Sequence, residues 1–142
     1  MNKDVVEVEV YNVVQEQNVD QYILLLKEKE GQRFFPIWIG QFEAHSIYLA
    51  LTNQKFERPL THDLIKIILN ALNVRIPMVV VNDVKDRTYY ARIVLEADGG
   101  KIFTIDARPS DSIAIALRMN SKIYVAKNIM DEAGITPEEI GI

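Results

Sequence analysis

The chain of 142 residues contains no cysteine. This absence excludes disulfides, cysteine nucleophiles and zinc sites with cysteine ligands, and it is typical of proteins of the reducing cytoplasm. No apolar run reaches the roughly 18–20 residues that a membrane-spanning helix needs. The first residues also lack the apolar segment of a secretory signal. We therefore expect a cytoplasmic protein that does not associate with membranes.

A block of basic residues is missing as well. The 16 Lys and Arg are spread along the chain, and 20 Asp and Glu bring the formal net charge to −4. Because Lys and Arg neutralise phosphates, this balance argues against a protein that coats nucleic acid without specificity. A local basic groove, or an acidic site that holds a metal, stays possible.

The two halves of the chain resemble each other. Residues 22–37 align with residues 90–105 without a gap at an offset of 68, and both segments contain an acid–glycine turn. After a slip of two residues, 46–51 and 112–117 both read Ser-Ile-x-x-Ala-Leu. We therefore predict an internal duplication.

The composition, 49% apolar and 25% charged, predicts a globular domain. We expect one α+β domain over residues 1–136, with halves at about 1–73 and 74–136 that share one sheet, and a loose tail at 137–142. Apolar–polar alternation predicts strands at 5–14, 21–29, 33–38, 76–83, 89–96 and 101–105. The expected helices are 41–53, 61–72, 110–119 and 129–133.

Two polar junctions each lead into an apolar helix. Residues 58–63 read Arg-Pro-Leu-Thr-His-Asp, and residues 106–111 read Asp-Ala-Arg-Pro-Ser-Asp. Helices that are apolar on most sides are expected to be buried. Free N–H groups at a helix N-terminus suit an anion, and the acids beside them suit a metal.

Helix capping explains only part of these junctions. Thr61 and Ser110 are expected N-caps, and Asp63 and Asp111 would stabilise the first turns. Arg108 could pair with a neighbouring acid or bind a phosphate. His62 could be an inert surface residue or part of a functional site, and both alternatives stay open. Capping leaves four residues unexplained: Arg58, His62, Asp106 and Arg108.

The first junction region also contains aromatic residues. Trp38, Phe42 and Tyr48 could offer a stacking surface, but aromatic residues beside a core helix are expected in the core. We expect no catalytic role for His45. Glu43 is either a metal ligand or a solvated helix carboxylate.

Three segments resemble the bifunctional nuclease domain family: Phe-Pro-Ile-Trp-Ile-Gly at 35–40 and the two junctions at 58–63 and 106–111. The resemblance runs from about Val5 to Gly134. It implies two repeats, each of three strands and two helices, around a single barrel-like mixed sheet, often in a homo-oligomer. It attaches nuclease activity on DNA and RNA chiefly to plant members that carry additional segments.

One hypothesis for function is therefore a nuclease that hydrolyses phosphodiester bonds of DNA or RNA with Mg²⁺ or Mn²⁺. These ions take oxygen ligands, so the predicted metal ligands are Asp106, Asp111 and Glu43. The predicted catalytic residues are His62, Asp63 and Arg108, with Arg58 and Arg108 binding the substrate. The alternative is a non-enzymatic module that binds an anion, a nucleotide or a protein. The net negative charge favours the alternative, and the family resemblance favours the nuclease.

Overall fold

The computed structural model describes residues 4–17 and 20–141. Its strands are β1 (Val5–Gln15), β2 (Tyr22–Glu28), β3 (Phe34–Ile39), β4 (Arg75–Lys85), β5 (Thr88–Glu96), β6 (Ile102–Ala107) and β7 (Lys122–Ala126). Its α-helices are α1 (Gln41–Leu51), α2 (Thr61–Ala71), α3 (Pro109–Met119) and α4 (Lys127–Ala133), and a short 3-10 turn spans Asp98–Gly100. The α+β class is confirmed.

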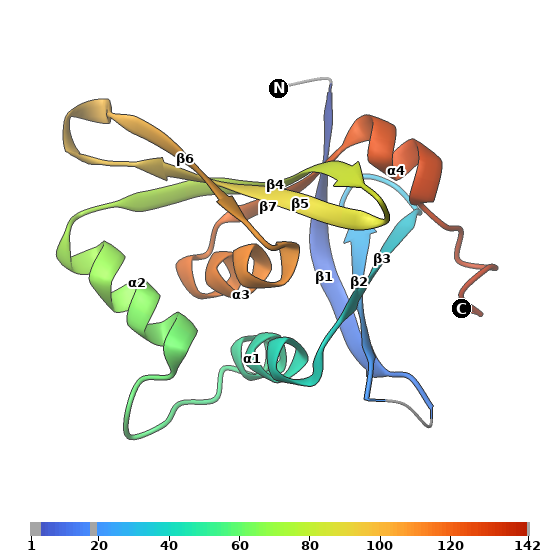
Figure 1. Cartoon of the computed structure of the whole chain (residues 1–142), viewed down its shortest axis with the longest axis horizontal. Coiled ribbons are helices and arrows are strands. Elements are labelled where there is room, and N and C mark those ends of the chain that lie inside the picture. The colour runs from blue at the N-terminus through green and yellow to red at the C-terminus, as the bar shows by residue number, and fades with distance from the viewer. Residues whose placement is uncertain (1–3, 18–19, 142) are drawn as a thin grey trace.

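The strands form one open, mixed sheet in the order β3-β2-β1-β7-β4-β5-β6. Neighbouring strands are antiparallel except for β4 and β7, which are parallel. The expected barrel-like closure is wrong, because β3 and β6 remain the two edges of the sheet. The sheet bends instead, so that β1–β3 and β4–β6 enclose an angle that holds α1 and α3 (Figure 1).

The internal duplication is not confirmed. Each half begins with a three-stranded antiparallel meander, as the sequence predicts. The second half, however, places β7 between α3 and α4, and β7 pairs with both β1 and β4 at the centre of the sheet. The short apolar run Ile123–Val125 forms this buried strand, so the second half does not consist of three strands and two helices.

Helix α3 is buried, as its apolar sequence predicts. It packs against β4 and β5 on one side and contacts α1 and α2 on the other. Its small residues Ala114 and Ala116 are fully buried and allow this close approach. The N-terminus of α3 therefore lies where three helices meet.

Helix α2 is not buried, so the expectation for this second helix is wrong. None of its residues is buried, and Leu64, Ile67 and Ile68 are about half exposed. Its principal contact is α3, and it lies at the outer end of the helical layer (Figure 1). None of the helices in the described part of the chain has both the length and the apolar character for crossing a bilayer.

A buried carboxylate fixes the turn between β2 and β3. Glu28 Oε1 accepts hydrogen bonds from the backbone N–H and the Nε of Arg33 at 2.9 and 3.0 Å, and Oε2 accepts one from Nη2 at 3.0 Å. These bonds, above all those from the Arg33 side chain, lower the pKa of Glu28. Arg33 also donates to Asp131 on α4 at 2.8 Å, so the clamp ties this turn to the end of the domain.

Substitution of Glu28 tests this clamp. Glu28→Gln keeps the shape of the side chain but leaves the charge of Arg33 poorly satisfied, so the free energy of unfolding should fall by about 1–3 kcal/mol. Denaturant unfolding measures the change. The control Glu30→Gln alters an exposed carboxylate of the same turn and should change stability by less than about 0.5 kcal/mol. Equal effects in the two variants would contradict the clamp.

Candidate active site

The two polar junctions meet in space. His62, in the first turn of α2, lies with Nε2 2.9 Å from Oδ1 of Asp111, in the first turn of α3. Arg108 Nε donates to Oδ2 of the same carboxylate at 3.0 Å, and its Nη1 donates to Glu43 Oε2 on α1 at 3.2 Å. We call Glu43, His62, Arg108 and Asp111 the four-residue cluster. It joins the N-terminal turns of three helices.

Both ring nitrogens of His62 have partners. Nδ1 lies 2.6 Å from Ser46 Oγ on α1, opposite the contact with Asp111. An ionised carboxylate only accepts hydrogen bonds, so Nε2 carries a proton toward Asp111, and in the neutral ring Nδ1 accepts from Ser46. The His62 side chain is only 13% exposed. The ring is therefore held in one orientation by two polar partners.

Charges within the cluster stabilise one another. Burial alone would raise the pKa of Asp111, but hydrogen bonds from Arg108 and His62 outweigh this effect and lower it. Asp111 in turn raises the pKa of Arg108. The Arg108 side chain is 63% exposed, so its guanidinium is the part of the cluster most open to solvent.

Asp63 lies in the first turn of α2, as expected, but it pairs with Arg118 and not with the four-residue cluster. Its Oδ1 accepts from Arg118 Nε at 2.7 Å, and its Oδ2 accepts the Leu60 N–H at 3.1 Å. Burial would raise the pKa of Asp63, but these bonds lower it. Arg118 also donates to the backbone oxygen of Ser46 at 3.1 Å, so this ion pair holds α2 and α3 against α1.

The expected N-caps, Thr61 and Ser110, lie inside their helices. The N-cap positions are Leu60 and Arg108, both with extended backbone and without a side-chain cap. Pro109 occupies the first turn of α3, where its missing N–H costs no helical hydrogen bond. Arg108 thus leaves the helix start with its side chain free to reach the acids of α1 and α3.

Two other predicted residues lie apart from these contacts. Asp106 is exposed on the edge strand β6, opposite Arg92 of β5. Arg58 is exposed in the loop before α2 and forms no ion pair with any residue that the structure describes. Within residues 4–17 and 20–141, no group of three or more His, Asp or Glu is placed to hold a metal. A metal site formed by Asp106, Asp111 and Glu43 therefore stays a prediction.

Two cavities border the cluster. One of about 270 Å³ is lined by all four of its residues and by Ser46. A second, of about 530 Å³, is lined by Glu43, Arg108 and Arg87. Arg87 belongs to the β4–β5 turn, for which the sequence favours a solvated turn over contact with a phosphate backbone. Two guanidinium groups on one cavity favour an anionic ligand.

Comparison with known proteins identifies the family. Residues 24–138 match the bifunctional nuclease domain. The chain belongs to the bifunctional nuclease domain family. A Mycobacterium tuberculosis protein described as uncharacterised is 41% identical over 134 residues, which cover 94% of this chain and 79% of the relative.

Plant members of the family are more distant and longer. Bifunctional nuclease 1 of Oryza sativa subsp. japonica is 27% identical, over 83% of this chain and 38% of its own length. Bifunctional nuclease 2 of Arabidopsis thaliana is 27% identical, over 89% of this chain and 40% of its own length. The chain therefore spans well under half of these two plant proteins.

The lowered pKa of Asp111 predicts a pH dependence of stability. An acid with a lowered folded pKa stabilises the fold above its ordinary pKa, and the contribution is lost as pH falls through the folded value. The stability difference between wild type and Asp111→Asn should therefore shrink as pH falls below the ordinary value of 3.8. Denaturant unfolding at about pH 5 and about pH 3, where ordinary histidines stay protonated, measures this difference.

The exposed Asp98 provides the matched control, because it lies in the 3-10 turn away from the cluster. Asp98→Asn should give nearly the same stability difference at both pH values. A difference for Asp111→Asn that stayed constant with pH would show that the cluster does not hold this carboxylate in its charged form.

Proposed function

We propose that the chain hydrolyses phosphodiester bonds of DNA or RNA at the four-residue cluster. The observation that carries this proposal is the hydrogen bond between His62 and Asp111, which lies directly beside the exposed guanidinium of Arg108. A held imidazole next to an exposed cation can transfer protons beside a bound phosphate. Membership in the bifunctional nuclease domain family supports the same chemistry.

Arg108 is the proposed phosphate ligand. Arg108 forms ion pairs with Asp111 and Glu43, yet its side chain is exposed enough to leave guanidinium N–H groups open to a substrate. Arg87 on the same cavity would bind a second phosphate oxygen or a neighbouring phosphate. Arg58, exposed before α2, would contact the nucleic acid farther from the scissile bond.

His62 is the proposed general acid or base. Asp111 holds the imidazole and favours the proton on Nε2, which leaves Nδ1 to exchange a proton with Ser46. Because Ser46 and His62 line the same cavity, the hydroxyl can connect the ring to a water there. Asp63 would act indirectly, because its bond to Arg118 fixes the helix that carries His62.

A divalent ion fits part of this arrangement. Glu43 and Asp111 direct carboxylate oxygens toward the same guanidinium, and Mg²⁺ commonly uses only one or two carboxylates besides water and phosphate. These two residues would hold Mg²⁺ or Mn²⁺ together with water and phosphate oxygens, whereas Asp106 on β6 lies apart from them. When bound, the ion would acidify a water and offset charge on the phosphate.

We also infer a cytoplasmic homo-oligomer. The absence of cysteine from the sequence supports the location. The half-exposed apolar side chains of α2, together with Ile102, Phe103 and Ile105 on the edge strand β6, support association between copies.

A nuclease assay on labelled DNA and RNA oligonucleotides tests the proposal. With Mg²⁺ or Mn²⁺ we expect cleavage that a chelator abolishes. His62→Ala and Asp111→Asn should each reduce the rate about 100- to 10,000-fold, the range for loss of general acid–base catalysis. Asp98→Asn should cleave at the wild-type rate.

Cleavage that survives in both His62→Ala and Asp111→Asn would contradict the proposed site. Absence of cleavage by folded wild type, together with oligonucleotide binding, would favour the alternative of a non-enzymatic anion- or nucleotide-binding module. Cleavage that persists with chelator but requires His62 would retain the site and remove the metal from the proposal.

A further inference from the structure

Helix α1 presents a second face beside the cluster. Glu43 and Ser46, three residues apart, point to the cluster and its histidine. Gln41, His45 and Tyr48 recur at intervals of four and three residues, which places them together on another face. Both faces therefore belong to one rigid element.

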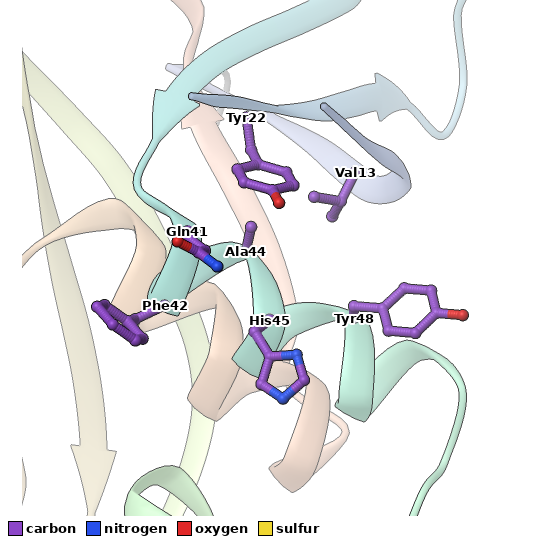
Figure 2. Close-up of a pocket in the computed structure, with 7 residues that line it drawn as sticks. All are labelled: Val13, Tyr22, Gln41, Phe42, Ala44, His45 and Tyr48. Carbon is purple, nitrogen blue, oxygen red and sulfur yellow. The ribbon is translucent and has the colours of Figure 1, made fainter. Parts of the chain in front are cut away.

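This second face borders a separate cavity of about 380 Å³. Figure 2 shows Tyr22 and Val13, from β2 and β1, above the helix, with Gln41, Ala44, His45 and Tyr48 on the helix itself. The volume lies within the range of about 300–1,000 Å³ that is usual for small-ligand sites. No Lys, Arg, Asp or Glu lines it.

Phe42 connects this cavity to the cluster. It lines both the 380 Å³ cavity and the 270 Å³ cavity that contains His62 and Asp111. A ligand with its phosphate at Arg108 could therefore extend past Phe42 into the uncharged cavity. Nucleic acid has this arrangement, in which an uncharged aromatic base is attached to a charged backbone.

The aromatic residues around these cavities are exposed, and the expectation that they belong to the core is wrong. Phe42 is 83% exposed, Tyr48 51% and Trp38 56%. Trp38 lines the cavity that contains Arg87 and Arg108. Exposed aromatic rings beside arginine side chains are an arrangement by which proteins stack the bases of single-stranded nucleic acid.

We propose that the cavity between α1 and strands β1 and β2 binds an unpaired nucleobase, so that the substrate is single-stranded nucleic acid. Phe42 and Tyr48 extend to opposite sides of this stretch of α1 and supply two separate stacking surfaces (Figure 2). The Gln41 amide and Tyr22 hydroxyl supply hydrogen bonds to the base edge. A base inside a duplex is paired and stacked and cannot enter such a cavity. The inference rests on the proposed function, because Arg108 must bind the adjoining phosphate.

Binding measurements separate base recognition from phosphate attraction. The probes are a fluorescein-labelled single-stranded oligothymidylate, an abasic oligomer with the same number of phosphates, and a duplex of equal length. We expect the single strand to bind more tightly than the abasic oligomer by about 5- to 150-fold, the effect of one stacked base. The duplex should bind no better than the abasic oligomer.

Variants locate the preference on α1. Phe42→Ala and Phe42→Leu should each remove most of the advantage of the single strand, because leucine keeps apolar contact but cannot stack. Tyr48→Ala should reduce it further. Phe56→Ala is the matched control, because Phe56 is exposed to the same extent as Tyr48, at 52% against 51%, but lies in the α1–α2 loop. It should keep the full preference.

Equal binding of the single-stranded and abasic oligomers, equal loss in Phe56→Ala and Phe42→Ala, or no binding of any oligomer would each overturn the inference. The anisotropy measurement needs no cleavage, so it can contradict base binding at the α1 cavity without contradicting nuclease activity at the four-residue cluster. A Phe42-dependent base preference without cleavage would retain the base site and remove the nuclease, whereas cleavage without such a preference would do the reverse.

Discussion

The hydrogen bond between His62 and Asp111 is the interaction on which this site depends. The two residues are 49 positions apart in the sequence, and they lie in the first turns of α2 and α3, which pack against each other. The contact requires the first turn of α2 to lie against the first turn of α3. Arg108 is bound to the same carboxylate, which accepts a hydrogen bond from its Nε, and Glu43 accepts one from its Nη1. One pair thus assembles residues from three helices.

A second ion pair keeps that contact in register. Arg118 is almost fully buried, and it reaches Asp63 on α2, the backbone of α3 and the backbone of Ser46 on α1. Each nitrogen of this buried guanidinium donates one hydrogen bond, and removal of its charged partner would be costly. The inner pair, Arg118 with Asp63, therefore has a structural role, while the outer pair, Arg108 with Asp111, faces solvent. Two similar Arg–Asp pairs in one small domain thus differ in the exposure of their arginine side chains, 63% for Arg108 against 7% for Arg118.

Much of the fold could be predicted, because alternation along the strands and apolar helix faces are local signals. The partners of His62 could not be predicted, since adjacency in the sequence favours Asp63, whereas the helix turns Asp63 toward Arg118. The sequence favours a core position for α2, Phe42 and Tyr48 over an exposed one, because an apolar residue looks the same in a core and on a binding surface. The short apolar run of β7 gives no indication that this strand joins β1 and β4 at the centre of the sheet.

The most direct test of the account is a double-mutant cycle on His62 and Asp111, read as the free energy of unfolding. His62→Ala, Asp111→Asn and the double variant are compared with wild type near neutral pH. Because the residues are in contact, we expect a coupling energy of about 0.5–3 kcal/mol. Effects that add to within about 0.3 kcal/mol would show that the two helix starts do not meet, and a shared site would be contradicted.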